Sequence, residues 1–459
     1  MGFSSIRQFL SHSAENIGFK VLENEEFVNN INQSLDESGK WHQRERRLTA
    51  PFMMRFMFAL MLFRSLSIVN VLKMFLQHLR ALRPFLPLSA VTPEAACHAR
   101  ERLGVEPMRL FFERQAREVE PYSLFHGMQV WGVDGTRFNI PDTAANESFF
   151  GRPKASRGET AYPQMGAVCL VETSTRQVGA AVFTPYDIGE RVGVEKMLNR
   201  LAVNDILLMD RGISAGWLFY ELQKRSLHFI GKISSTWQPD IIKRFGGGDF
   251  LVSVKVNAPS KLKKERKLPK ALTLRMIRYQ IGENENVRLL TNLVDTEKYP
   301  PLELAKLYHS RWECELAYDE LKNHLTSRAS GVQDLLFRSK KPDGVLQEAY
   351  ALVGLYNTIR GIMAESGKIH KIEPADISFV ETVQIIKDTM PRYQAAKNDN
   401  QRLTILAQML KDIAETKNQR PRRKRQYPRV VKKKMSSYKL KRKDCVQKLM
   451  DAQKEMKLI

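Results

Sequence analysis

Two aspartates stand where apolar runs of the chain end. Asp134 follows the mainly apolar run 128–133, and Asp210 follows the predicted strand 205–209, whose residues 206–209 are apolar. Each precedes a glycine by one or two residues, and glycine lets the backbone turn sharply and leaves room for a metal ion or a phosphate. Acids that end the strands of an α/β sheet emerge at its carboxyl edge, where such sheets bind ligands. A single aspartate in this place often does no more than cap a turn, but the pair indicates a ligand site.

A third acid belongs to a long helix predicted from about residue 301 to residue 325. At about 100° per residue, four of its polar side chains fall within about 60° of one another on one face. They are Tyr308, Arg311, Glu315 and Lys322. One acid, two bases and a phenol are typical of a helix face that meets an anionic partner. The alternative is a row of salt bridges on a solvated face.

The remaining acids of this helix narrow the choice of a catalytic carboxylate. By the same spacing, Glu313 and Glu320 point away from the polar face, and Asp319 is the local rival to Glu315. Three converging carboxylates can hold two hard divalent cations through oxygen ligands. Two such ions about 4 Å apart can activate a water or a 3′-hydroxyl and stabilise a leaving oxygen, which suits in-line displacement at a phosphodiester. The two bases of the face would steady the phosphates.

The elements around these acids predict a mixed α/β sheet, because strands first follow one another and then alternate with helices. Predicted strands cover residues 128–133, 164–171, 177–183, 205–209, 228–233 and 287–294, and predicted helices cover residues 189–199, 214–226, 301–325 and 343–363. Residues 237–285 break this rhythm with strand-like runs at 250–256 and 272–281. A basic loop at 261–270 lies between those runs and either faces a phosphate or is simply solvated.

The two ends of the chain differ from the centre. Residues 1–120 predict helices at 52–63, 69–82 and 92–103, without strand alternation. In the last of these, Thr92 is the expected N-cap and Pro93 the first helical residue. That helix carries His98, Arg100 and Arg102, which suit either DNA entry or a solvated face. The C-terminal part is helical and polar, and residues 417–443 then carry fourteen Lys or Arg and no acid.

Composition points to a polyanionic partner. The chain has 459 residues, 73 Lys plus Arg and 50 Asp plus Glu, for a net charge of +23. The most apolar stretch, residues 51–63, is too short to span a membrane and contains Arg55. Four widely separated cysteines match no zinc spacing and no disulfide framework, which is typical of a reduced, cytosolic protein.

Three motifs together carry a family resemblance. They are Asp134-Gly135-Thr136, Asp210-Arg211-Gly212 and the run from Tyr308 to Lys322. They resemble the three signature regions of the insertion-element-four family of bacterial DDE transposases, and the run matches that family's Y-R-E-K signature at all four positions with the correct spacing. The resemblance covers most of residues 40 to 430. It also includes residues 87–91, 141–143, 162–164, 338–342 and 427–430.

The resemblance implies an α/β fold with an RNase H-like catalytic core interrupted by a β-rich insertion. An N-terminal helical DNA-binding domain and a helical, basic C-terminal region would flank that core. The implied parts are an inverted-repeat-binding domain at 1–120, the core at 121–236 and 287–375, the insertion at 237–286 and the C-terminal region at 376–459.

The resemblance also implies a function and its residues. Asp134, Asp210 and Glu315 would be catalytic and would bind two Mg²⁺ ions, with Mn²⁺ able to substitute. The residues implied to contact DNA or its phosphates are Tyr308, Arg311, Lys322, Arg338 and Lys340. The enzyme would cut and rejoin double-stranded DNA at the inverted repeats of its element, as a homodimer in a synaptic complex, in the bacterial cytoplasm at the nucleoid. The alternatives are a domesticated transposase that only binds DNA and a nuclease without strand transfer, and the intact acids favour the active transposase.

One feature departs from relatives that form hairpins. In those, a Trp in the strand before the acidic helix stacks on a flipped base. Residues 287–291 contain no Trp here, and neither Trp237 nor Trp312 matches by position. We expect Trp312 to pack against the core or the insertion.

Overall fold

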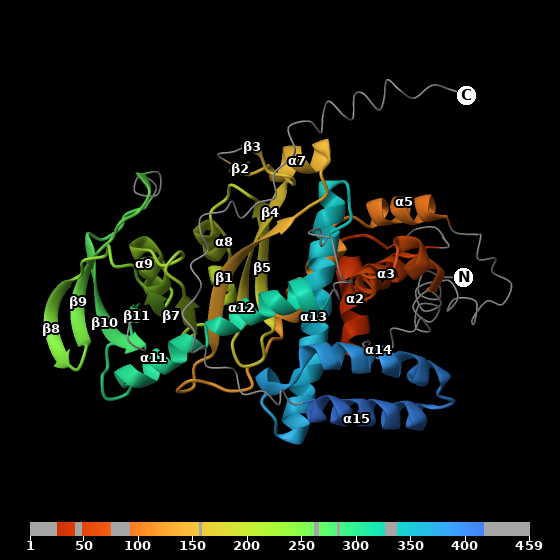
Figure 1. The fold of residues 1–459 in the computed structure, drawn as a ribbon. Coiled ribbons are helices and arrows are strands. Elements are labelled where there is room, and N and C mark those ends of the chain that lie inside the picture. Colours follow the sequence, from red (N-terminus) through yellow and green to blue (C-terminus); the bar gives the residue numbers. More distant parts are fainter. Residues whose placement is uncertain are drawn as a thin grey trace.

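The computed structural model describes residues 25–41, 48–74, 92–155, 158–260, 266–281, 285–325 and 337–416 (Figure 1). Its strands are β1 Val130–Asn139, β2 Lys154–Ala155, β3 Gly158–Glu159, β4 Gln164–Glu172, β5 Val178–Pro185, β6 Ile206–Met209, β7 His228–Lys232, β8 Asp240–Gly246, β9 Asp249–Lys255, β10 Ala271–Ile281 and β11 Glu285–Thr291. Its α-helices are α2 Glu25–Glu37, α3 Ala50–Leu62, α5 Pro93–Leu103, α6 Glu106–Arg117, α7 Ala144–Phe150, α8 Glu190–Met197, α9 Gly216–Lys224, α11 Pro301–His309, α12 Trp312–Asp319, α13 Pro342–His370, α14 Phe379–Ala395 and α15 Asp399–Glu415.

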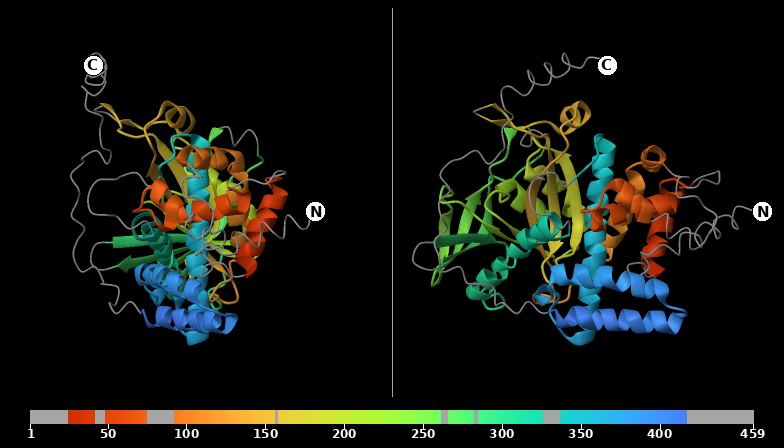
Figure 2. Two further views of the ribbon diagram at one scale, coloured as in Figure 1. Left: turned by 90° about the vertical axis from the view of Figure 1, so that its right-hand side faces the viewer. Right: turned by 45° about the vertical axis from the view of Figure 1, so that its right-hand side comes forward.

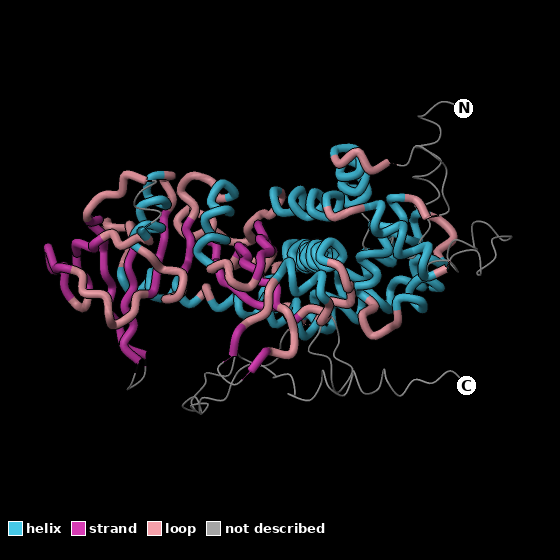
Figure 3. The backbone as a smooth tube through the Cα atoms, turned by 90° about the horizontal axis from the view of Figure 1, so that it is seen from above, coloured by secondary structure: helices cyan, strands magenta, loops and turns pink. Residues whose placement is uncertain are grey.

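The predicted mixed α/β sheet is present. Within the described ranges it has nine strands in the order β5-β4-β1-β6-β7-β11-β10-β9-β8. Strands β1, β6 and β7 are parallel to one another, and the other neighbours are antiparallel. Seen from above, the strands fill one half of the molecule and the helices dominate the other (Figure 3).

The register of β1 places the two aspartates side by side. Val133 pairs with Met209 in the parallel β1–β6 ladder, so Asp134 and Asp210 are the next residues on adjacent strands. The expectation that β1 ends before Asp134 is wrong. The strand continues to Asn139, because β4 pairs with it along that whole length, from Trp131 onward, whereas β6 stops at Met209.

The strands of residues 240–281 extend the same sheet beyond β11 and form no separate sheet. Strands β9 and β10 agree with the predicted runs, whereas β8 was missed. All seven residues of β8 are exposed. The strand therefore has no buried face, and its sequence does not show the alternation of apolar and polar residues by which a strand is predicted. Of the basic loop, residues 261–265 lie outside the described part of the chain.

Helices cover both faces of the sheet. One face of β1, β4 and β6 packs against α8 and α9. The opposite face of the sheet packs against α11, α12 and α13. Helix α13 stands upright between the sheet and the N-terminal helices (Figure 2). All thirteen residues of α3 are buried in the core that α13 shares, so its apolar stretch is a core helix. Within the described residues, no helix is long and apolar enough to cross a membrane.

The N-terminal helices follow the sequence closely. Thr92 caps α5 through its Oγ1, which accepts a hydrogen bond from the Ala95 N–H at 3.2 Å, and Pro93 begins the helix. The predicted helix at 69–82 is present as helical residues 68–74, and its remainder lies outside the described residues. Arg100 neither faces DNA nor lies on a solvated helix face, which were the two roles expected for it. Its guanidinium is buried and donates to the carboxylate of Glu348 on α13 at 3.3 Å, since both charges need a partner away from water.

Candidate active site

The two strand aspartates are held by backbone N–H groups. Gly135 N–H donates to Asp134 Oδ1 at 2.8 Å, and Ile213 N–H donates to Asp210 Oδ1 at 2.9 Å. The turn expected at Gly212 is present, because residues 211–213 form a turn and the Ser214 N–H donates to Asp210 O at 3.0 Å, whereas the turn expected at Gly135 is absent. Gly135 is instead part of β1, and its missing side chain provides space rather than a turn.

Arg311 joins the third acid to the first. Its Nη2 donates to Glu315 Oε1 at 2.5 Å, and its Nη1 lies 3.4 Å from Asp134 Oδ2. Only 12% of the Arg311 side chain is exposed, so this bridge is largely shielded from water. The structure therefore brings Asp134 and Glu315 to opposite sides of one guanidinium, beside the strand position of Asp210.

The long helix predicted over residues 301–325 is interrupted, so uniform 100° spacing does not describe it. Helix α11 ends at His309, a tighter turn follows at residues 310–311, and residues 320–324 form a π-helix after α12. Hydrogen bonds from Ser310 N to Leu307 O and from Arg311 N to Tyr308 O close that turn. The predicted split of the acids holds, because Glu313 and Glu320 are buried away from Arg311.

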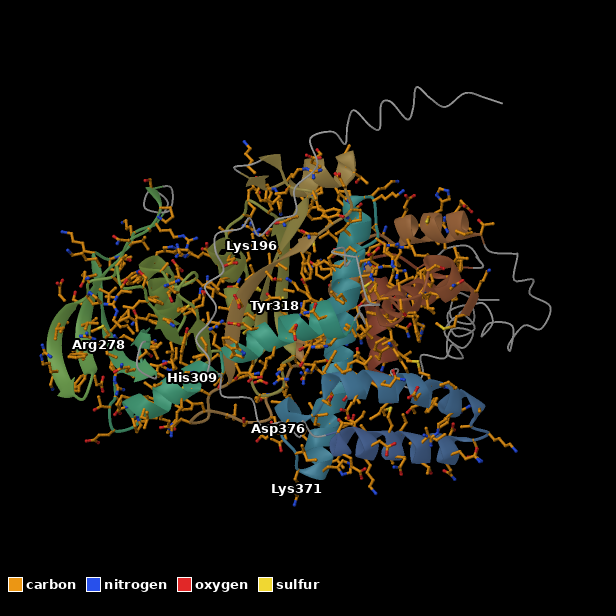
Figure 4. All side chains as sticks on the ribbon, viewed as in Figure 1. Lys196, Arg278, His309, Tyr318, Lys371 and Asp376 are labelled. Atoms are coloured by element: carbon orange, nitrogen blue, oxygen red, sulfur yellow. The ribbon has the colours of Figure 1, made fainter. Side chains whose placement is uncertain are left out.

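Close contact with β1 positions the acidic helix. A Cβ at Gly132 would lie 2.3 Å from Cys314 Sγ, so only glycine allows α12 this near. Tyr318, labelled on α12 in Figure 4, donates from Oη to Asp134 O at 2.8 Å and accepts from the Cys169 N–H at 3.1 Å. Tyr318 is a site residue that was not predicted from the sequence. The sequence places Tyr318 three residues after Glu315, but it does not indicate that the phenol hydroxyl bonds to the backbone of Asp134 and Cys169.

Lys322 also reaches β1. Its ammonium donates to Thr136 Oγ1 and, at 3.1 Å, to Arg137 O, and it lies 4.8 Å from the centre of the Phe138 ring. Burial lowers the pKa of Lys322 to about 8, although the charge of Asp134 acts in the opposite direction. Lys322 therefore stands two residues along β1 from the first aspartate.

The other predicted DNA contacts lie elsewhere. Tyr308 is 7% exposed and belongs to the core between α11 and the sheet. Burial raises the pKa of its phenol. Arg338 donates to the carbonyl of Arg64, and Lys340 is an exposed residue whose carbonyl accepts from Thr143 Oγ1. The described contacts join neither Arg338 nor Lys340 to the three acids.

The two tryptophans take different positions. Trp312, the first residue of α12, is 38% exposed, so the expectation that it packs into the core or the insertion is wrong. Cys314, two residues further along α12, is the side chain that packs against Gly132 of β1. Trp237 is partly buried and lies 6.0 Å from the Phe219 ring.

A basic hollow opens beside the second aspartate. It measures about 700 Å³ and is lined by residues of the loop after β6 and of β7, β10 and β11. Its cations are Arg211, Lys232, Arg278 and Arg288, and its described lining holds no acid. Figure 4 labels Arg278 among the strands of the sheet's outer half. These charges are scattered along the sequence, so only the pairing of the strands brings them together.

Comparison with known proteins identifies the family. The family model described as Transposase DDE domain matches residues 126–358, which contain all three predicted acids. The chain belongs to the DDE transposases. A second model, described as Insertion element 4 transposase N-terminal, matches residues 18–113 of this transposase. The insertion-element-four family inferred from the three motifs is thereby confirmed, and with it a metal-dependent enzyme that cleaves and transfers DNA.

Two relatives from Escherichia coli are also transposases by name. The transposase is 29% identical over 414 residues to "Transposase InsG for insertion sequence element IS4" of Escherichia coli (strain K12), covering 89% of this chain and 90% of InsG. It is 30% identical over 129 residues to "Putative transposase InsZ" of the same organism, covering 27% of this chain and 43% of InsZ. A solved piggyBac transposase synaptic complex with hairpin DNA aligns with a TM-score of 0.41 and 11% identity, covering 85% of this chain and 84% of that one.

The carboxylate oxygens at this site are donors of the type that a divalent metal takes, but they are not gathered around one point. Within the described ranges, no three His, Cys, Asp or Glu side chains are gathered closely enough to hold a metal ion. The positive charge of the Arg311 guanidinium lies between Asp134 and Glu315 and balances these carboxylates in the structure. Carboxylate oxygens are the ligands that Mg²⁺ and Mn²⁺ accept, and crowded carboxylates favour a cation.

The pH dependence of this site follows from Asp134. Burial raises the pKa of its carboxyl from 3.8 to about 6, and the negative charges of Asp210 and Glu190 also raise it. The hydrogen bond from Gly135 and the charge of Arg311 lower this pKa but do not cancel the effect of burial. Because the folded state holds this proton more tightly than the unfolded state, we expect the metal-free protein to lose stability as the pH rises from about 4 to about 6. If Asp134 is a metal ligand, a divalent cation would bind its deprotonated carboxylate and should restore stability above about pH 6.

Thermal unfolding in EDTA and in excess MnCl₂ checks this expectation. The increase in Tm caused by Mn²⁺ should be larger at pH 7 than at pH 5. The variant Asp134→Asn should lose the pH-dependent part of that increase, which separates this carboxyl from other titrating groups. An equal effect of Mn²⁺ at both pH values would contradict the assignment.

Proposed function

We propose that this transposase binds the terminal inverted repeats of its own insertion sequence and catalyses Mg²⁺-dependent strand cleavage and strand transfer. The observations that support this most directly are the strand pairing that makes Asp134 and Asp210 neighbours and the guanidinium that joins Asp134 to Glu315. Asp134 and Asp210 are neighbours by strand register, and Arg311 links Asp134 to Glu315. We further propose that the sheet core is RNase H-like, with the part boundaries expected from the sequence.

Asp134, Asp210 and Glu315 would hold two Mg²⁺ ions, for which Mn²⁺ can substitute. The ions would supply charge stabilisation to the attacking and leaving oxygens of the phosphodiester. Arg311 must release at least one carboxylate for that role, and its freed guanidinium is then available to a phosphate as a bidentate donor. Tyr318 keeps the acidic helix fixed at Asp134 throughout.

Basic residues beside the acids and others farther away would contact the DNA. Lys322 contributes a point charge beside Asp134, and Tyr308 supports Arg311 from the core. Arg338 and Lys340, which precede α13, and the basic hollow would extend the positive surface. We propose that two copies of the chain act together on double-stranded DNA, in the bacterial cytoplasm at the nucleoid.

The DNA that flanks the gene supplies the substrate for the test. Imperfect inverted repeats bounded by short direct repeats would define the element ends. Purified full-length protein should bind these ends, cut them in Mg²⁺ and join them to target DNA. Binding without cleavage would favour the domesticated DNA-binding protein, and cleavage without joining would favour the nuclease.

Lys322 should contribute to catalysis more than to affinity. In Lys322→Ala we expect strand transfer to fall by about 10²-fold, because a positioned cation near the reacting phosphate is lost. The affinity for element ends in a gel-shift assay should change far less. Lys411→Ala, at an exposed lysine of α15, is the matched control and should match the parent in both assays. Complete loss of DNA binding in Lys322→Ala would make this residue an anchor for DNA.

A further inference from the structure

Strand pairing places the basic hollow beside Asp210. Met209 pairs with Gly231 in the parallel β6–β7 ladder, so the next residues, Asp210 and Lys232, stand level on adjacent strands. Lys232 pairs in turn with Leu289 of β11. The hollow of about 700 Å³ therefore opens at the sheet edge where β6 and β7 end, one strand beyond the second aspartate.

Two arginines face each other across the outer side of this hollow. Arg278 of β10 lies directly opposite Arg288 of β11 in their antiparallel ladder, and like charges in this arrangement are destabilising. Arg211, the residue after Asp210, adds a third positive charge to the lining. Among the residues that the structure describes, no acid lines the hollow or forms a salt bridge with these three arginines. Their charge is therefore available to an anion from outside the chain.

The two facing arginines are held in place by the protein itself. The Arg288 guanidinium donates to Ser234 O in the loop after β7. The Arg278 N–H donates to Gly248 O at 2.8 Å, and a Cβ on Gly248 would lie 2.4 Å from Arg278 O, so the turn between β8 and β9 needs glycine here. The Arg278 guanidinium lies 5.7 Å from the centre of the Phe250 ring. A phosphate that enters the hollow would meet donors whose positions are already set.

The sheet also gives the separation between the hollow and the acids. Neighbouring strands lie about 4.8 Å apart, so β10 is about 14 Å from β6 across β7 and β11. One strand of duplex DNA carries a phosphate every 3.4 Å or so along the helix axis, so the hollow corresponds to a position about three or four base pairs from the acids. This distance suits a second contact on the same duplex.

The N-terminal helices lie on the other side of the acids. Helix α6 contacts β5, at the opposite end of the strand order from β10. Figure 1 shows α2, α3 and α5 at the opposite end of the molecule from β8, β9 and β10. These helices lie in the part that matches the insertion-element N-terminal model, residues 18–113, to which the proposed function gives the inverted repeat. DNA that runs from these helices across the acids reaches the hollow only beyond the cleavage site.

We propose that the hollow lined by Arg211, Arg278 and Arg288 binds a backbone phosphate of the donor DNA that flanks the element. The proposal rests on the proposed function, because it assigns a further stretch of DNA to the same active site. A contact with the backbone does not depend on the flanking sequence, which differs at each insertion. The contact is lost once the flank is cut away, so it favours the uncleaved end over the cleaved end.

The test is a gel-shift titration of the full-length protein in EDTA, so that no cleavage occurs. Two duplexes share one element end, and one stops at the cleavage site while the other continues for about ten base pairs of flank, one helical turn. Arg278→Gln and Arg211→Gln should each weaken binding to the flanked duplex by about 10-fold, because a charge-assisted contact is lost. Binding to the shorter duplex should change far less.

The salt dependence of binding identifies a phosphate contact. On the flanked duplex, Arg278→Gln should lower the slope of log affinity against log salt by about one, the value for one phosphate. Arg278→Lys keeps the charge and should keep the parental slope. The matched control is Lys255→Gln, at an exposed lysine of β9 outside the hollow, which should bind both duplexes as the parent does.

The other outcomes separate this proposal from the proposed function. Equal weakening on both duplexes would place the hollow on the element itself, and no weakening on either would show that it takes no phosphate. Either result would overturn the flank contact and leave the proposed function standing, provided that the parent binds the element ends. Weakening by Lys255→Gln to the same extent would show a general charge effect and would also overturn the contact. Failure of the parent to bind either duplex would overturn both proposals.

Discussion

Asp134→Asn, Asp210→Asn and Glu315→Gln should each reduce Mg²⁺-dependent strand cleavage by at least about 10³-fold, since metal-held charge stabilisation contributes several kcal/mol at a phosphodiester. Each change keeps the size of the side chain and removes one anionic oxygen. Binding to element ends should persist, because the cations proposed to contact DNA remain. Cleavage of labelled ends, with gel-shift affinity measured in parallel, separates the two properties.

Asp319→Asn is the control for the helical acid. Asp319 lies in the same helix one turn beyond Glu315, and its carboxylate is engaged by Asn323 and His324. Removal of its charge should leave cleavage at the parental rate. Full activity in any of the three test variants would exclude that residue from the active site, and loss of activity in Asp319→Asn would make it the catalytic acid in place of Glu315.

Local sequence patterns were sufficient to predict where the strand aspartates lie. A short apolar run that ends in an acid marks a buried strand at a sheet edge, and β6 followed by Asp210 has this form. The extent of β1 could not be predicted in the same way. It depends on pairing with β4, from Asp134 opposite Cys169 to Asn139 opposite Gln164, and nothing within β1 itself encodes that partner.

The acidic helix was predicted as one continuous element because its residues favour a helix throughout. What interrupts it is tertiary contact. Cys314 must fit against Gly132, and Tyr318 must reach the Asp134 carbonyl, while Glu313 faces the other way toward Arg176. The turn at residues 310–311 and the π-helix at residues 320–324 change the direction of the side chains, so that all of these contacts can form.

The buried acids of this helix form an ion cluster with α13. Arg360 is fully buried and donates to both oxygens of Glu320, with Nε at 3.0 Å from Oε2. Arg176 donates to Glu320 at 3.0 Å and to Glu313 at 2.5 Å, and Tyr356 Oη donates to Glu320 at 2.9 Å. Two arginines thus balance two glutamates, and Glu320 is the member that all three donors share.

Glu320→Gln should lower the free energy of unfolding by about 3–5 kcal/mol, because it leaves two buried guanidinium groups with a single carboxylate. Unfolding in urea measures the change. The control is Glu120→Gln, which breaks an exposed pair with Lys368 and should cost less than about 1 kcal/mol. A change in Glu320→Gln no larger than in this control would show that the cluster contributes little to stability.

The same variant links stability to catalysis. Glu320 begins the π-helix that also carries Lys322, and its contact with Arg360 fastens that segment to α13. If this attachment sets the position of Lys322 beside Thr136, Glu320→Gln should slow strand transfer even at temperatures where the protein remains folded. The double replacement Glu320→Met with Arg360→Met removes both charges of the central pair, so it should recover part of the lost stability without restoring the lost attachment. Strand transfer that recovers together with stability would instead mean that folding alone limits the variant.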